Sequence, residues 1–96
     1  MTQLLKPLFP LGQVVATPGA LDALGGEGIR ADALLQRHAI GDWGEVCEDD
    51  KRENDLSVTE GFRILSAYTL PKTQVKLWII TEADRSATAL LLPDDY

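Results

Sequence analysis

The fold is decided by RILSAYTL at residues 63–70 and VKLWIITEADRSATALLLPDDY at residues 75–96. From Phe62 onward, apolar side chains recur at every second position, which is the periodicity of β-strands. Proline and aspartate favour turns, so we expect one turn at residues 71–74 and another near Asp84-Arg85. The pattern therefore predicts three consecutive antiparallel strands that end before Pro93.

The N-terminal part predicts a short strand followed by a capped helix. Residues 13–16 (QVVA) read as a strand. Thr17-Pro18 then marks a helix start, because threonine can cap free N–H groups and proline suits the first helical position. We expect this helix to end at Gly25-Gly26, where a glycine can adopt positive φ.

Two further helices are expected before the strands begin. One covers residues 31–39, with Leu34, Leu35 and His38 on its inner side, and Trp43 should fill the gap between the helices and the sheet. The other covers residues 48–55, with an ion pair between Glu48 and Arg52 one helical turn apart.

These elements predict an α+β fold in one domain spanning residues 1–96. The expected order is β-α-α-α-β-β-β, with an antiparallel sheet of three to four strands and the helices on one face in two layers. Trp78 and Ile80 alternate with Leu77 and Ile79, which indicates that both faces of the middle strand are at least partly covered. Three short helices cannot cover both faces, so we expect self-association through the sheet, as in a homodimer.

Charge and composition narrow the classes of function. The net charge is −6, and Lys51-Arg52 is an isolated basic pair among acids, so we expect no direct binding of nucleic acid. Cys47 is the single cysteine and His38 the single histidine, which predicts neither a disulfide nor a metal site. We also expect no cofactor and no membrane segment. Prolines interrupt the N-terminal apolar run, which argues against a signal peptide, and a cytoplasmic location fits the lone cysteine.

The acidic segment from Asp42 to Asp55 is the first candidate site. Its carboxylates face only two basic residues, so it could bind a protein that has a basic surface, including one that normally holds DNA. The same charge also promotes solubility without any partner. The residues predicted to contact a partner are Asp42, Trp43, Glu48, Asp49, Asp50 and Glu53.

A second polar cluster lies on the predicted strands and their last turn. Carboxylates beside a guanidinium could bind a cation, polarise a phosphate or act as acid and base. The cluster consists of Arg63, Tyr68, Glu82, Asp84 and Arg85. The structural alternative is that Asp84 starts the turn and Arg85 pairs with Glu82 across it. His38 could likewise be a general base, or could interact with the last carbonyl groups of its helix. We assign no catalytic residue from the sequence.

Four blocks of the sequence resemble a family of short bacterial proteins found in genomic islands and on plasmids. They are FPLGQVVATPGAL (9–21), RHAIGDWGEV (37–46), RILSAY (63–68) and LWIITEADRSATALLLPDDY (77–96). Members of the family are called plasmid-related or "type I restriction endonuclease subunit M". The second label conflicts with this chain, which lacks the glycine-rich cofactor loop and the Asn-Pro-Pro-Phe-type sequence of methylation subunits. The resemblance therefore implies a neighbourhood of defence systems and assigns no functional residue.

Together these observations predict a small acidic accessory protein of mobile genetic elements that acts by binding another protein. One specific form is an inhibitor of a restriction or CRISPR defence system. The alternative is a nuclease-like or other hydrolytic enzyme whose site lies on the C-terminal sheet. The two differ in shape, because an enzyme needs a concave pocket that holds its polar groups together.

Overall fold

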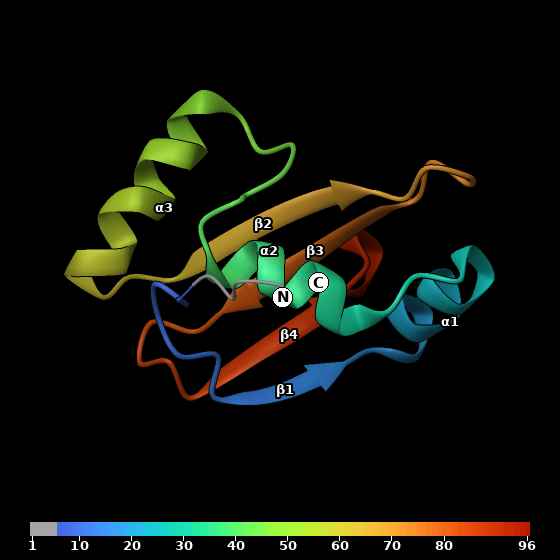
Figure 1. The fold of residues 1–96 in the computed structure, drawn as a ribbon, viewed down its shortest axis with the longest axis horizontal. Coiled ribbons are helices and arrows are strands. Elements are labelled where there is room, and N and C mark those ends of the chain that lie inside the picture. Colours follow the sequence, from blue (N-terminus) through green and yellow to red (C-terminus); the bar gives the residue numbers. More distant parts are fainter. Residues whose placement is uncertain (1–5) are drawn as a thin grey trace, which may run out of the picture.

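The computed structural model describes residues 6–96 and confirms the predicted α+β fold (Figure 1). Three α-helices precede a C-terminal set of three strands, and a four-residue strand comes first. The elements are β1 (Gln13–Ala16), α1 (Pro18–Glu27), α2 (Ala31–Ala39), α3 (Glu48–Glu60), β2 (Ile64–Thr69), β3 (Lys76–Thr81), β4 (Ala87–Leu91) and the 3-10 helix η1 (Pro93–Asp95).

The four strands form one sheet in the order β1-β4-β3-β2. The predicted meander is present, because β2 pairs antiparallel with β3 and β3 pairs antiparallel with β4. The prediction of a fully antiparallel sheet was wrong in one respect, because β1 pairs with β4 in parallel, with Gln13 opposite Ala87. The physical reason is the crossover, since helices α1 to α3 and two further strands lie between β1 and its partner.

The helix boundaries agree with the sequence at the starts better than at the ends. The Thr17 hydroxyl accepts a hydrogen bond from Ala20 N at 3.1 Å, and Pro18 is the first helical residue, as predicted. The expected end of α1 at Gly25-Gly26 was wrong, because the helix continues to Glu27 and Gly28 takes the left-handed conformation. Helix α2 has the predicted bounds, and α3 extends beyond the predicted Asp55 to Glu60.

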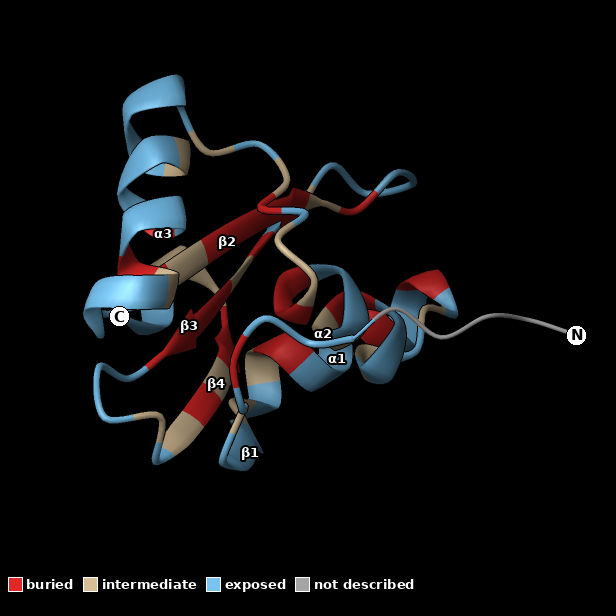
Figure 2. Ribbon diagram, turned by 60° about the vertical axis from the view of Figure 1, so that its left-hand side comes forward, coloured by how far each residue is buried: buried red, intermediate tan, exposed pale blue. Residues whose placement is uncertain are grey.

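The main core lies between the sheet and the first two helices. Figure 2 shows α1 and α2 on one side of the strands, and the buried strand residues lie in β2, β3 and β4. Ala20 and Leu24 of α1 and Leu34 of α2 pack against alternate residues of the strands. The strand residues of this cluster are Tyr68, Leu77, Ile79 and Leu90, with Leu70 just beyond β2. Burial of these apolar side chains is the main favourable contribution to folding.

The opposite face of the sheet is partly covered by the C-terminal residues. Ile80 and Leu91 are buried there, and the Tyr96 ring meets the Trp78 ring edge-on with centroids 5.9 Å apart. Arg63 lies over the other side of the same ring, with its guanidinium carbon 5.5 Å from the Tyr96 centroid. The expectation that both faces of β3 are at least partly covered is thus met within a single chain.

A smaller core lies around Trp43, which fills the space between α2 and the sheet as predicted. Trp43 packs with Phe9 and Ile64, and only 4% of its surface is exposed. Its indole N–H donates to the Asp55 carboxylate at 3.0 Å, which connects the loop after α2 to helix α3. The indole therefore has both its apolar body and its polar atom satisfied inside the protein.

Candidate functional site

Helix α3 concentrates the charge of the molecule. It contains six acidic and two basic residues and so carries a net charge of −4, out of −6 for the whole chain. Its acids are all exposed: Glu48, Asp49, Asp50, Glu53, Asp55 and Glu60. The first three lie in the first turn, where the positive end of the helix dipole favours carboxylates.

The ion pairs on α3 differ from the predicted Glu48–Arg52 pair. Lys51 Nζ lies 3.5 Å from Glu48, and Arg52 pairs with Asp49, both three residues apart on the exposed surface. This spacing also brings side chains together on a helix. Within residues 6–96, neither Asp50 nor Glu53 has an ion-pair partner, so the helix presents uncompensated negative charge to the solvent.

The inner side of α3 fixes the orientation of this acidic face. Asn54 is buried, and its side-chain amide spans the edge of β2 by accepting from Leu65 N–H at 3.2 Å and donating to Leu65 C=O at 2.7 Å. Ser57 is buried beside it. Because these residues face the strand, the opposite side of α3, which includes Glu48, Asp49, Asp50 and Glu53, is exposed, and Figure 2 shows the helix mostly in the colour of exposed residues.

Two residues of the predicted partner-binding set have other roles. Trp43, which was predicted to contact a partner, is buried in the smaller core and so is not part of the exposed acidic surface. Asp42 is exposed, but it accepts a hydrogen bond from Arg37 Nε at 2.6 Å. That bond and burial act in opposite directions, and the bond prevails, which lowers the pKa of Asp42. The acidic face is therefore formed by Glu48, Asp49, Asp50 and Glu53 on α3, and we call these four residues the α3 acidic face.

The second candidate set is dispersed over both faces of the sheet. Tyr68 is buried under the helices, where its hydroxyl donates to Asp42 C=O at 2.6 Å, and burial raises its pKa to about 12. Arg63 is on the exposed surface against Tyr96. The structure therefore does not bring Tyr68 and Arg63 together.

The last turn uses its charged side chains to hold the backbone. Arg85 donates to the backbone carbonyls of Phe62 at 2.7 Å, Ser57 at 2.7 Å and Glu82 at 3.1 Å. The expected pairing of Arg85 with Glu82 across the turn thus involves the carbonyl group rather than the carboxylate. Asp84 accepts from Ser86 N–H at 3.0 Å, a bond typical of turns, and contacts with Ser86 lower its pKa.

His38 belongs to a buried chain of hydrogen bonds that the sequence did not predict. Its Nδ1 lies 2.5 Å from the Ser66 hydroxyl and its Nε2 lies 2.9 Å from the Thr81 hydroxyl. Thr81 and Thr88 hydroxyls are 2.7 Å apart, and Thr88 donates to Leu11 C=O at 2.7 Å. The expected interaction of the imidazole with the last carbonyls of α2 is replaced by contacts to β2 and β3, and Thr81 extends the chain of hydrogen bonds to β4.

The donor and acceptor of each hydrogen bond in the His38 chain follow from the Leu11 carbonyl group at its end. Leu11 C=O can only accept, so Thr88 donates to it and accepts from Thr81, and Thr81 accepts from His38. Nε2 therefore carries the proton, and Nδ1 accepts from Ser66. Burial lowers the pKa of His38 to about 4, which keeps the imidazole neutral. Each group has its partner inside the core, so the chain stabilises the fold and leaves His38 no contact with solvent.

Glu27 is a further polar residue whose role sequence reasoning missed. Its carboxylate accepts from Lys72 N–H at 3.0 Å, from Thr73 N–H at 2.7 Å and from the Thr73 hydroxyl at 2.6 Å. The Thr73 hydroxyl is the main cause of the lowered pKa of Glu27. This residue ties the end of α1 to the turn between β2 and β3, and no sequence pattern links positions so far apart.

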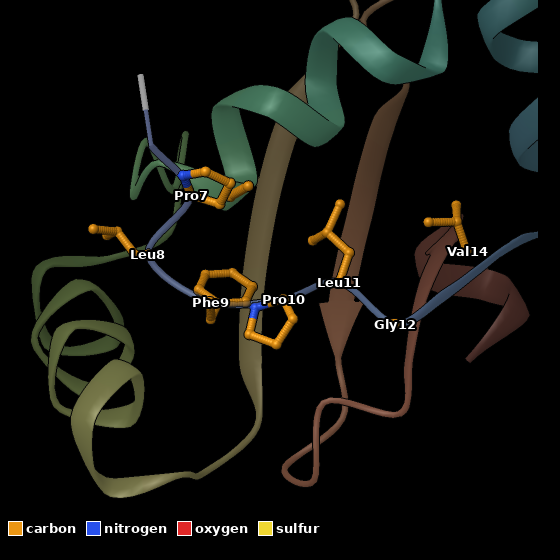
Figure 3. A pocket seen from close by; sticks show the side chains of 8 residues that line it. Pro7, Leu8, Phe9, Pro10, Leu11, Gly12 and Val14 are labelled. Carbon is orange, nitrogen blue, oxygen red and sulfur yellow. The ribbon is translucent and has the colours of Figure 1, made fainter. Parts of the chain in front are cut away.

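A hollow on the surface lies between the N-terminal segment, the end of α2 and strand β1 (Figure 3). Its volume is about 640 Å³ and its lining contains no ionisable side chain. It is lined by Pro7, Leu8, Phe9, Pro10, Leu11, Gly12, Val14 and Ala39. Such a surface suits apolar side chains rather than acid–base chemistry.

Searches for metal ligands, membrane spans and relatives give three negative findings. Residues 6–96 contain no group of three His, Cys, Asp or Glu side chains placed to hold a metal ion. No helix in this part of the chain has the length and hydropathy required to cross a membrane. Comparison with protein-family models, with curated proteins and with solved structures finds no match to this chain.

Proposed function

We propose that this chain acts by binding another protein through the α3 acidic face. The partner would present a basic surface, because four exposed carboxylates on one helix attract opposite charge and accelerate encounter. The observation that supports the proposal is the orientation of α3: Asn54 holds its inner side against β2, which leaves the carboxylates outward. The helix that carries the site is thus already positioned by Asn54 before any partner arrives, and a pre-ordered backbone loses little entropy on binding.

Two exposed apolar side chains near the end of α3 refine the chemistry of the partner. Leu56 is 51% exposed and Phe62 is 54% exposed. Protein interfaces combine apolar contacts with a charged rim, so a partner with an apolar patch beside its basic groups would fit this surface. Charged contacts would then determine the rate and the specificity, and the apolar contacts would contribute affinity.

The resemblance to proteins of genomic islands and plasmids suggests the biological setting. We propose an accessory protein of mobile genetic elements that inhibits a restriction or CRISPR effector by occupying a surface that normally holds nucleic acid. Such effectors bind nucleic-acid backbones with basic channels, which match the sign of α3. A cytoplasmic location is part of this proposal, and the lone exposed Cys47 is compatible with a reducing compartment.

The hydrolytic alternative finds no supporting geometry in the described residues. A hydrolase needs a concave site in which polar groups converge. Tyr68 is buried, Arg63 lies on the other face, and Arg85 is engaged with backbone carbonyls. The hollow beside β1 has an apolar lining.

The test is charge reversal on α3. The triple variant Glu48→Lys, Asp49→Lys, Asp50→Lys should reduce capture of purified restriction or CRISPR effector complexes at least tenfold, and the loss should grow at low salt. The matched control reverses three exposed acids elsewhere, Asp22, Glu82 and Asp94. Equal capture by the native chain and the α3 variant, or an equal loss in the control, would contradict the proposed site.

A further inference from the structure

The outer edge of β1 is a row of backbone groups that bond to no other backbone group of residues 6–96. The parallel register uses Gln13 N–H, which donates to Ser86 C=O at 3.0 Å, and Thr17 N–H, which donates to Leu90 C=O at 3.0 Å. Backbone groups alternate in direction along a strand, so those of Val14 and Ala16 point away from β4. Among residues 6–96 no strand pairs with this edge.

The edge also lacks the features that normally prevent pairing. Edge strands are protected by charged side chains, prolines or bulges. β1 contains none of these, and its two valines are exposed by 45% and 46%. Residues 7–21 contain no charged side chain, although the chain has a net charge of −6. Asp95 lies at one end of the strand, where it accepts from the Thr17 hydroxyl at 2.7 Å.

We propose that a second copy of this chain pairs with this edge, β1 against β1 in antiparallel orientation. Two acidic molecules repel each other, so contact is favoured where both are neutral, and the β1 region is the long neutral stretch of this chain. The strand is also complementary to itself. A register with Val14 opposite Ala16 of the second copy uses both outward N–H groups and both outward C=O groups of each strand.

The same register brings apolar surfaces together on both faces. The two copies of Val15 lie opposite each other at the two-fold axis, on the face away from the helices. On the helix side, the first turn of α1 of the second copy comes next to the Val14 end of β1, where the apolar hollow lies (Figure 3). That turn includes Leu21, which is 54% exposed. Hydrogen bonds and apolar contacts therefore act together.

The pairing gives a continuous sheet of two copies and leaves α3 at its outer ends. In the order β1-β4-β3-β2, strand β2 and the helix beside it are farthest from the new contact. Each dimer would then present two α3 acidic faces. Because β1 is only four residues long, the interface is small and the dimer weak, with a dissociation constant on the order of 10–100 μM.

Sedimentation over a concentration range tests the proposal with a proline at the outward position. Val14→Pro removes an N–H group that bonds to no backbone group of residues 6–96, so we expect the fold to be kept while pairing is blocked at two places. We expect the native chain to shift from monomer to dimer between about 5 μM and 1 mM, and Val14→Pro to weaken the dimer at least tenfold. Val14→Thr keeps the N–H group and should still dimerise.

A second variant keeps the test decisive if the proline variant does not fold. Val15→Lys places like charges opposite each other at the two-fold axis and alters only an exposed side chain, so it should also give monomers. The charge-reversed α3 variant should dimerise like the native chain. Native protein that stays monomeric at 1 mM, or dimers that survive both Val14→Pro and Val15→Lys, would overturn the proposal.

Discussion

The two edges of the sheet differ in how their backbone groups are satisfied. At the β2 edge, Asn54 bonds Leu65, and Ala67 exchanges hydrogen bonds with Trp43 C=O at 3.1 Å and Glu45 N–H at 2.7 Å. The Glu45 carboxylate then accepts from Thr69 N–H at 2.7 Å. At the β1 edge, no strand of the described chain bonds to the outward N–H and C=O groups. Edge protection in this protein thus comes from the loop and helix before β2, since neither strand contains a charged residue.

The covered edge of the sheet, at β2, depends on Gly44, which lies against that strand. Gly44 has a φ of +76°, and a Cβ atom added there would lie only 2.0 Å from Ala67 C=O. A side chain would therefore push the loop away from β2. At the outer edge of β1, no strand or loop of residues 6–96 makes backbone hydrogen bonds of this kind, which is why we propose that this edge pairs with another chain.

Matched prolines at the two edges should show the largest difference. Ala67→Pro removes an N–H group that bonds to Trp43 C=O, so we expect a loss of about 3 kcal/mol or more in the free energy of unfolding. Val14→Pro removes an outward N–H group that has no backbone partner within the described part of the chain, and should cost less than about 1 kcal/mol. Urea unfolding of dilute protein measures both values. Similar losses of unfolding free energy in the two variants would contradict the claim that the β2 edge is hydrogen-bonded within the chain and the β1 edge is not.

Removing the side chain that covers β2 should have the next largest effect. Asn54→Ala leaves the N–H and C=O groups of Leu65 without their partner, which should destabilise the protein by about 2 to 3 kcal/mol. Thr59→Ala on the same helix is the control, because Thr59 is exposed and bonds only within its own turn. A loss below about 1 kcal/mol for Asn54→Ala would mean that water replaces the amide at this edge.

Acid should weaken the hydrogen-bond chain by which His38 connects strands β2, β3 and β4. His38 has a pKa of about 4 when folded and 6.5 as the ordinary value, so the unfolded chain binds the proton more readily. The contribution is complete above the ordinary pKa and is lost as the pH falls. We expect about 2 kcal/mol less stability at pH 5 than at pH 7. His38→Leu should remove most of this dependence, and an unchanged pH profile in that variant would contradict the assignment.

The sequence was most informative where local rules decide the structure. The three C-terminal strands follow from period-two alternation, and Thr17-Pro18 starts α1 by its capping chemistry. Helix α3 was predicted too short, because the extension beyond Asp55 includes Ser57, which is buried and whose C=O group accepts a hydrogen bond from Arg85 of the last turn. A tertiary contact of this kind has no local signature.

The candidate site could be predicted only in part, for the same reason. The acids of α3 were visible as a run of charge, whereas the burial of Trp43 depends on Phe9 and Ile64, which are distant in sequence. The parallel pairing of β1 and the partners of His38 and Glu27 also join remote segments. The types of side chain indicated which chemistry could occur. Only the fold showed which of these side chains are buried or hydrogen-bonded within the protein.

Hydrogen exchange at the two edges tests the central claim most directly. In dilute protein, we predict slow exchange for the amides of Leu65, Ala67 and Thr69 and fast exchange for those of Val14 and Ala16. Raising the protein concentration should slow exchange at Val14 and Ala16 alone. Equal protection of both edges in dilute protein, or exchange at Val14 and Ala16 that stays fast at 1 mM, would contradict one closed and one pairing edge.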